Sequence, residues 1–114
     1  MAQRIVSQSL QKQVFATVPT GMPHQPINLL GVIATNQDAS NQHYLQVFDR
    51  ATLPTGGNVP LCELQCPKGL QESLDLSHFG NVNIATGLTM AASTTSGTYT
   101  DSGSAVFFVT VFYS

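Results

Sequence analysis

Charged residues are scarce in this chain of 114 residues. Lys and Arg number four and Asp and Glu six, which is 9% of the sequence and gives a formal net charge of -2; a globular domain usually carries about 25% charged residues. The cations are scattered, so no patch gathers positive charge for binding phosphates. The composition therefore argues against a nucleic-acid partner and predicts a surface that is cheap to desolvate against a neighbour.

Long hydrophobic runs and targeting signals are also missing. No window approaches the ~18 unbroken apolar residues that span a membrane as a helix. Residues 1 to 20 lack the basic start and apolar core of a secretory signal, because polar residues interrupt every hydrophobic stretch. We therefore expect no membrane partner and a protein made in the cytoplasm.

Cys62 and Cys66 predict neither a disulfide nor a metal site. On a strand their Cα atoms would lie about 13 Å apart, at ~3.3 Å per residue, whereas a disulfide needs less than about 7 Å. No second Cys or His pair lies near them, and the histidines at 24, 43 and 78 form no HxH or HxxxH pair. We expect two small buried thiols, no metal and no cofactor.

No catalytic motif stands out. Glu63, Glu72 and Asp75 are carboxylates that a glycosidase pair would need, but nothing fixes their spacing, and the chain has no Trp to stack on a sugar. We therefore predict no catalytic residues and a protein that is not an enzyme.

Asp49 and Arg50 stand together at the end of a predicted strand. Neighbouring strand residues point to opposite faces, so the two side chains do not converge on a substrate. We expect loop fixation instead, with Asp49 accepting hydrogen bonds from backbone N–H groups of residues 50–57.

What the sequence does have is a succession of short strand signals. Apolar, β-branched runs separated by turn residues recur about every 8 to 14 residues, and no segment keeps a 3.6-residue period. They predict strands over residues 27–35, 43–48, 60–66, 72–76, 82–85, 88–93 and 105–113. The predicted fold is all-β, a single-domain β-sandwich or jelly roll.

The N-terminal part differs from this pattern. Residues 3 to 18 alternate raggedly and predict an extended N-terminal arm or an edge strand. Pro19, Gly21, Pro23 and Pro26 then forbid regular structure. The expected division is an arm and Pro-rich loop over residues 1–26 and a β-sandwich body over residues 27–114.

The last strand, residues 105 to 113 (AVFFVTVFY), is apolar on both faces. A sandwich strand with one face in water alternates apolar with polar side chains, so the second face of this strand must be covered by the N-terminal arm or by another protein. We expect an interface formed by the arm and one face of this strand. Its residues are Val14, Phe15, Val18, Phe107, Val109, Val111 and Tyr113.

Another set of residues carries a family resemblance. The set comprises Ala34-Thr35-Asn36, the run from His43 to Ala51 (HYLQVFDRA), Leu53-Pro54 with Gly57, Val59 and Pro60, and then Phe79-Gly80, Thr86-Gly87-Leu88 and Ser93-Thr94-Thr95. Over residues 27 to 113 the chain resembles small β-sandwich virion proteins of tailed bacteriophages. The resemblance implies a structural component of the virion, a capsid decoration or cement protein, with the tail or baseplate as the other location.

The resemblance also implies partners. A decoration protein made in the host cytoplasm would bind the major capsid protein on the outer capsid surface and stabilise the shell by bridging capsomers. A homotrimer would match the local symmetry axes of a shell. The alternative is a carbohydrate-binding module that uses the loops at 36–43 and 93–103, with Tyr44 and Tyr99 as its aromatic contacts.

Overall fold

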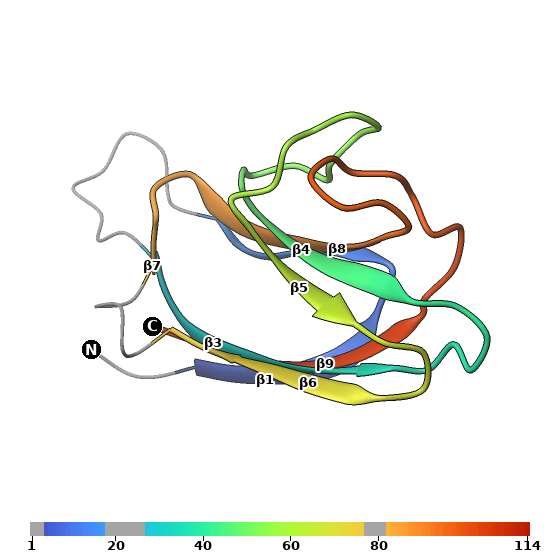
Figure 1. Ribbon diagram of the computed structural model, residues 1–114. Coiled ribbons are helices and arrows are strands. Elements are labelled where there is room, and N and C mark those ends of the chain that lie inside the picture. Colours follow the sequence, from blue (N-terminus) through green and yellow to red (C-terminus); the bar gives the residue numbers. More distant parts are fainter. Residues whose placement is uncertain (1–3, 18–26, 77–81) are drawn as a thin grey trace.

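The computed structural model describes residues 4–17, 27–76 and 82–114, which form a β-sandwich of two antiparallel sheets (Figure 1). This confirms the predicted all-β class. Sheet A has the strand order β1-β9-β3-β6, with β7 also paired to β3, and sheet B has the order β2-β8-β4-β5. The strands of sheet A are β1 (Arg4–Leu10), β3 (Ile27–Asn36), β6 (Gln71–Asp75), β7 (Val82–Ile84) and β9 (Phe107–Tyr113). The strands of sheet B are β2 (Lys12–Thr17), β4 (His43–Asp49), β5 (Cys62–Cys66) and β8 (Gly87–Ser93).

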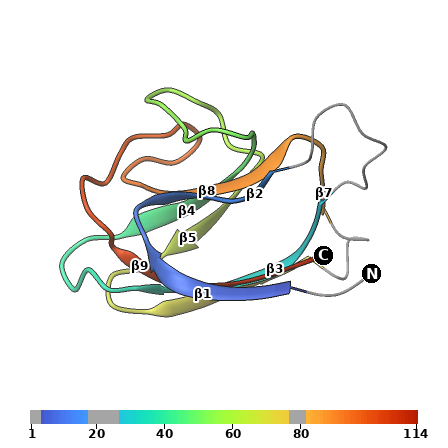
Figure 2. The same ribbon diagram turned by 180° about the vertical axis from the view of Figure 1, so that it is seen from behind.

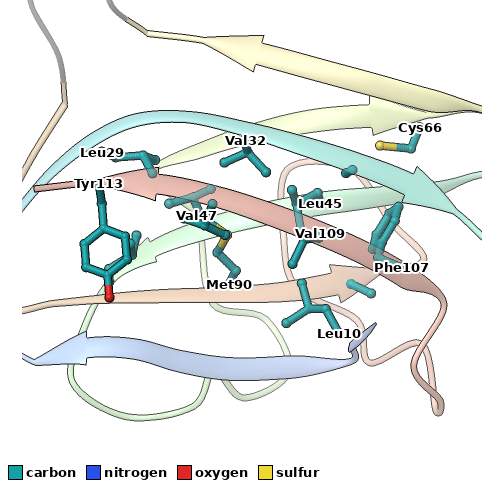
Figure 3. Packing of buried hydrophobic residues seen from close by; sticks show 14 of the residues in the cluster. Leu10, Leu29, Val32, Leu45, Val47, Cys66, Met90, Phe107, Val109 and Tyr113 are labelled. Carbon is teal, nitrogen blue, oxygen red and sulfur yellow. The ribbon is translucent and has the colours of Figure 1, made fainter. Parts of the chain in front are cut away.

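The inner faces of the two sheets form one hydrophobic core (Figure 3). Alternate residues of each strand point inward, because successive side chains of a strand lie on opposite faces. The fully buried inward side chains include Leu10, Leu29, Val32, Leu45, Val47, Met90, Phe107, Val109 and Val111. Both cysteines are free as predicted, with Cys66 buried and Cys62 half-buried at the rim of this core.

The N-terminal segment forms an edge strand in each sheet, which confirms the second of the two forms expected for residues 3 to 18, and it is not a free arm. β1 pairs with β9 in unbroken register from Arg4↔Tyr113 to Leu10↔Phe107. The chain then crosses to sheet B, where β2 pairs with β8 (Figure 2). The segment pairs with β9 and β8 and is not a free arm, because pairing satisfies its backbone N–H and C=O groups on neighbouring strands. The described sandwich therefore begins at Arg4 and not at residue 27; the Pro-rich stretch after residue 18 lies outside the described residues.

The chain also passes directly between the sheets on the opposite side. β5 of sheet B and β6 of sheet A are joined by a turn in which the Leu70 N–H donates to the Pro67 carbonyl at 3.2 Å. Gly69 adopts φ 69° there, a left-handed conformation that glycine takes without steric cost.

The final strand occupies an interior position in sheet A. β9 lies between β1 and β3 and pairs with both. The N-terminal segment therefore lies beside β9 and does not cover its second face. The second face of β9 is part of the outer face of sheet A.

Candidate interaction surface

The outer face of sheet A is a grid of side chains from four strands, and no described segment lies over it (Figure 1). The strand registers place its residues in three rows. From β1 to β6 these rows are Ile5, Phe112, Gly31 and Asp75; Ser7, Thr110, Ile33 and Ser73; and Ser9, Phe108, Thr35 and Gln71. Asp75, at the β6 edge, is the one charged residue of the three rows. Ile5 is 63% exposed and Phe108 is 42% exposed, so large apolar side chains are accessible on this face.

Hydroxyl groups separate the apolar side chains on this face. Ser7 Oγ and Thr110 Oγ1 lie 2.9 Å apart in a hydrogen bond across β1 and β9. This bond uses one of the two hydroxyl hydrogens, so the other needs an acceptor when this part of the face is covered. Covering the outer face therefore calls for hydrogen-bonding groups beside apolar contacts.

A hollow interrupts the grid where β3 bends. The register between β3 and β9 shifts between Leu29 and Gly31. A Cβ atom on Gly31 would lie 2.9 Å from the Leu74 carbonyl oxygen, so glycine lets β6 approach closely. The hollow, about 370 Å³, opens between Leu30, Ile33, Ser73, Asp75 and Phe112. It offers a place for an apolar side chain of a partner.

The outer face of sheet B is covered by the chain itself. The loops 50–61 and 94–106, here called the cover, lie over β4 and β8 (Figure 1). Tyr99 joins the two loops: its backbone carbonyl accepts from Gly57 N–H at 2.9 Å and its N–H donates to the Asn58 carbonyl at 2.8 Å. The Tyr99 ring meets the Phe48 ring edge to face, with centroids 6.0 Å apart. Tyr99, Phe48 and Ala91 form a second, smaller apolar cluster under the cover.

Buried polar groups hold loop 94–106 down on β4. Gln46 is fully buried, and its Nε2 donates to Glu63 Oε1 at 2.8 Å and to the Thr95 carbonyl at 3.0 Å. Burial raises the pKa of Glu63, but the hydrogen bonds from Ser96, Gln46 and the Gly97 N–H outweigh it and hold the pKa below its ordinary value. The Glu63 carboxylate therefore stays ionised and anchors the loop.

A second anchor ties the cover to the start of β2. Gln11 Nε2 donates to Asp101 Oδ1 at 2.9 Å, and Lys12 Nζ lies 3.2 Å from Asp101 Oδ2. The hydrogen bonds from Gln11 and from the Gly103 N–H are the main reasons that the pKa of Asp101 falls to about 2. Loop 94–106 is thus held near its start by Gln46 and Glu63 and again at Asp101.

The interface expected on β9 was assigned to the wrong face of the strand. Phe107, Val109 and Val111 are fully buried and Tyr113 is 8% exposed, because all four point between the sheets. Phe15 packs half-buried against the same core and Val14 is half-buried beside Thr89. Val18 lies outside the described residues. The face of β9 that is left for a partner carries Phe108, Thr110 and Phe112.

The structure also removes one of the two aromatic contacts expected for a sugar. Tyr99 is 2% exposed, and burial together with the nearby Asp101 carboxylate raises its pKa to about 12. Tyr44 is half-buried, and its hydroxyl accepts from Gln42 Nε2 at 2.9 Å. Tyr99 therefore holds the cover in place and presents no ring for stacking.

Asp49 and Arg50 fix loops, but not all through the expected contacts. Asp49 accepts hydrogen bonds from the backbone N–H groups of Ala85, Thr86 and Gly87, so it binds the turn before β8 and not residues 50–57. Burial opposes these bonds, yet they hold the pKa of Asp49 below its ordinary value. The Arg50 guanidinium donates to Asn58 Oδ1 inside the cover. The Asp49 contacts join segments that are far apart in the sequence, because β4 and β8 are neighbours in sheet B.

In the part of the chain that the structure describes, the remaining polar groups do not converge on a reaction site. Glu63 lies on the outer face of sheet B and Asp75 on the outer face of sheet A, so they flank no common substrate position. Burial, with the Glu72 charge, raises the pKa of Cys66 to about 12, which makes it a poor nucleophile. His43 Nε2 bonds Asp38 Oδ2 at 2.9 Å, and Asp38 in turn accepts from Ser40 N–H within the loop. Residues 4–17, 27–76 and 82–114 hold no cluster of metal-binding side chains.

Comparisons with known proteins found no matching family model, curated protein or solved structure. The resemblance to phage virion proteins therefore rests on the residues quoted above. Among the described residues there is also no helix long and apolar enough to cross a membrane.

Sequence reasoning missed the residues that make the outer face of sheet A. Ile5, Ile33, Phe108 and Phe112 come from three strands, and only their register brings them together. One local signal was present: Thr110 is the polar residue within β9, and it marks the face away from the core. The same middle row carries Ser7 and Ser73, also hydroxyl residues.

Proposed function

We propose that this chain is a capsid decoration protein, a virion structural protein that binds the outer surface of a capsid shell and stabilises it by bridging capsomers. The resemblance of residues 27 to 113 supports this function. The observation that carries it is the contrast between two outer faces: two loops cover that of sheet B, whereas no described segment covers that of sheet A, which is nearly uncharged.

The outer face of sheet A fits a protein surface better than a small ligand. Its four strands at ~4.8 Å spacing and up to seven residues at ~3.3 Å per residue give a footprint of roughly 400 Å². The apolar side chains Ile5, Ile33, Phe108 and Phe112 share this footprint with hydroxyl groups, and such a mixture of apolar and polar groups is typical of protein–protein interfaces. Its partner is the major capsid protein, through an uncharged area of the shell that offers hydrogen-bonding groups beside apolar contacts.

The rigid support of this face favours such a role. Every outward residue of β9 sits on a strand paired on both sides, over a fully buried core. The side chains are thus held in place before binding, which lowers the entropic cost of association. The carbohydrate-binding alternative loses this kind of support, since Tyr99 is buried.

Co-sedimentation with shells assembled from the major capsid protein of the same genome tests the proposal. Phe108→Ser should weaken binding at least ~10-fold, about 1.4 kcal/mol, because it removes an exposed aromatic ring from the outer face of β9. Val59→Ser is the matched control, since Val59 is an exposed apolar residue of the cover. Wild-type protein that does not bind shells, or equal losses for both variants, would reject the proposal.

A further inference from the structure

The edges of the two sheets are unequally protected against pairing with another strand. Natural proteins blunt sheet edges with charge, proline, bulges or short strands. β2 carries Lys12 and a register shift between Val14 and Ala16. β5 has five residues, contains Glu63 and lies between Pro60 and Pro67. β6 also has five residues and contains Glu72 and Asp75. β7 has only three residues.

β1 lacks every one of these devices beyond its first residue. It is the longest of the edge strands at seven residues, and positions 5–10 contain no charge and no proline. Its register with β9 is unbroken over its whole length, so no bulge twists it away. Among the described strands, β1 therefore presents the open edge, with a row of backbone groups ready to pair.

We propose that β1 pairs antiparallel with β1 of a second copy of this chain, so that two sandwiches share one continuous sheet. Pairing about Ser7 sets Ser7 against the same residue of the other copy and Ile5 against its Ser9. All these positions are uncharged, so a second copy meets no like charge along the edge, and the outward and inward sides of the two strands match.

The pair also changes the size of the outer face. One copy presents roughly 400 Å², whereas stable interfaces bury about 800 Å² on each partner. Two copies joined through β1 place their outer faces side by side on one sheet and present roughly 800 Å² together. The inference stands whether or not a shell is the partner of that surface.

Ser7 and Ser73 provide a matched test. They share the middle row of the outer face but lie on opposite edges of sheet A, on β1 and β6. In analytical ultracentrifugation from about 1 μM to about 1 mM, wild type and Ser73→Lys should form the same two-chain species. Ser7→Lys should weaken it at least ~10-fold, because it sets two cations against each other. A wild-type monomer throughout, a three-chain species, or equal effects of both substitutions would overturn the proposal.

Cross-linking removes any dependence on how well the Ser7→Lys variant folds. Opposed residues of antiparallel strands have Cα atoms about 4.5 to 5.5 Å apart, within the range that a disulfide bridges. Mild oxidation should convert Ser7→Cys to a disulfide-linked pair and leave Ser73→Cys at the level of wild type, which carries the same native cysteines. Equal cross-linking of the two variants would contradict the pairing.

A pair that does not bind shells would reject the proposed function alone, and shell binding by a monomer would reject the pairing alone.

Discussion

The two outer faces of this sandwich show two solutions to the same problem. Each sheet has apolar side chains on its outer side: Phe48 and Ala91 on sheet B, and Ile5, Phe108 and Phe112 on sheet A. Over sheet B, the chain supplies the cover and a set of buried hydrogen bonds. Over sheet A, no described segment does so. The comparison teaches that an apolar outer face need not be covered by the described part of the chain, and the outer face of sheet A is where we propose that a partner binds.

The comparison also explains why β8 is buried along its whole length while β9 is not. Every residue of β8 is buried, since the core lies on one side of it and the cover on the other. β9 has the more apolar sequence, yet Phe108 remains 42% exposed. Exposure here follows from what lies over a strand and not from its composition.

The largest expected effect comes from removing the cover's central ring. Tyr99→Ala should lower the free energy of unfolding by about 3 kcal/mol, because it empties the space against Phe48 and frees both loops. Urea unfolding followed by circular dichroism measures the change. Tyr44→Ala, at a half-buried tyrosine on β4 of sheet B, should lower the free energy of unfolding clearly less. An equal cost would mean that Tyr99 does not anchor the cover.

Removing the polar anchor of the cover should have the next largest effect. Gln46→Ala should cost about 2 kcal/mol of unfolding free energy, since it empties a fully buried site and removes one hydrogen bond each from the Thr95 carbonyl and Glu63. Gln65→Ala is the control: Gln65 is exposed on the adjacent strand and bonds Gln42, so its loss should stay within about 0.5 kcal/mol. Similar losses in both variants, by urea unfolding, would contradict a role for the Gln46 network.

Acid should weaken the anchors of the cover, alongside Asp38 and Asp49, whose pKa values also lie below their ordinary values. The folded-state pKa values of Glu63 and Asp101, both in contact with the cover, lie below their ordinary values, and that of Asp101 is about 2. As pH falls, the unfolded chain takes up protons first, so stability present above about pH 5 is lost as pH falls through the folded-state pKa values. Urea midpoints at pH 7, 4 and 3 should decrease in that order. Glu63→Gln should show a lower midpoint at pH 7 and a weaker pH dependence; an unchanged dependence would count against this assignment.

The smallest effect on stability is expected from a substitution on the outer face of sheet A, which no described segment covers. Phe108→Ser should change the unfolding free energy by no more than about 1 kcal/mol, because the ring is partly in water in the folded protein. The same urea experiment that is applied to Tyr99→Ala gives the comparison. A cost as large as that of Tyr99→Ala would mean that Phe108 supports the fold and is not reserved for a partner.

The sequence was a good guide to the strands and a poor guide to their neighbours. The predicted runs at 27–35, 43–48 and 88–93 agree closely with β3, β4 and β8, because alternation and turn residues are local signals. The split of residues 3 to 18 into strands of two different sheets had no such signal, since Gln11 between them is neither glycine nor proline. Sheet membership depends on pairing partners far along the chain.

The candidate site was predictable only in part. The double apolar character of residues 105 to 113 correctly indicated a strand, and the structure buries one of its faces in the core while Phe108 on the other face stays 42% exposed. Thr110, the polar residue of β9, marks the face of the strand that points away from the core. Ile5 and Ile33 could be added to that face only from the register of β9 with β1 and β3. The trimer expected from the resemblance stays a prediction, and the mass of the protein in solution decides between three chains and the pair through β1.

Carbene footprinting with mass spectrometry, on protein free and bound to shells, tests the central claim most directly. Ile5 and Phe108 report on the outer face of sheet A, and Leu53 and Val59 report on the cover; all four are exposed apolar side chains in the free protein. If the bare face is the docking surface, shells will protect Ile5 and Phe108 from labelling and leave Leu53 and Val59 unchanged. Protection of Leu53 and Val59 with free labelling of Ile5 and Phe108 would contradict the account.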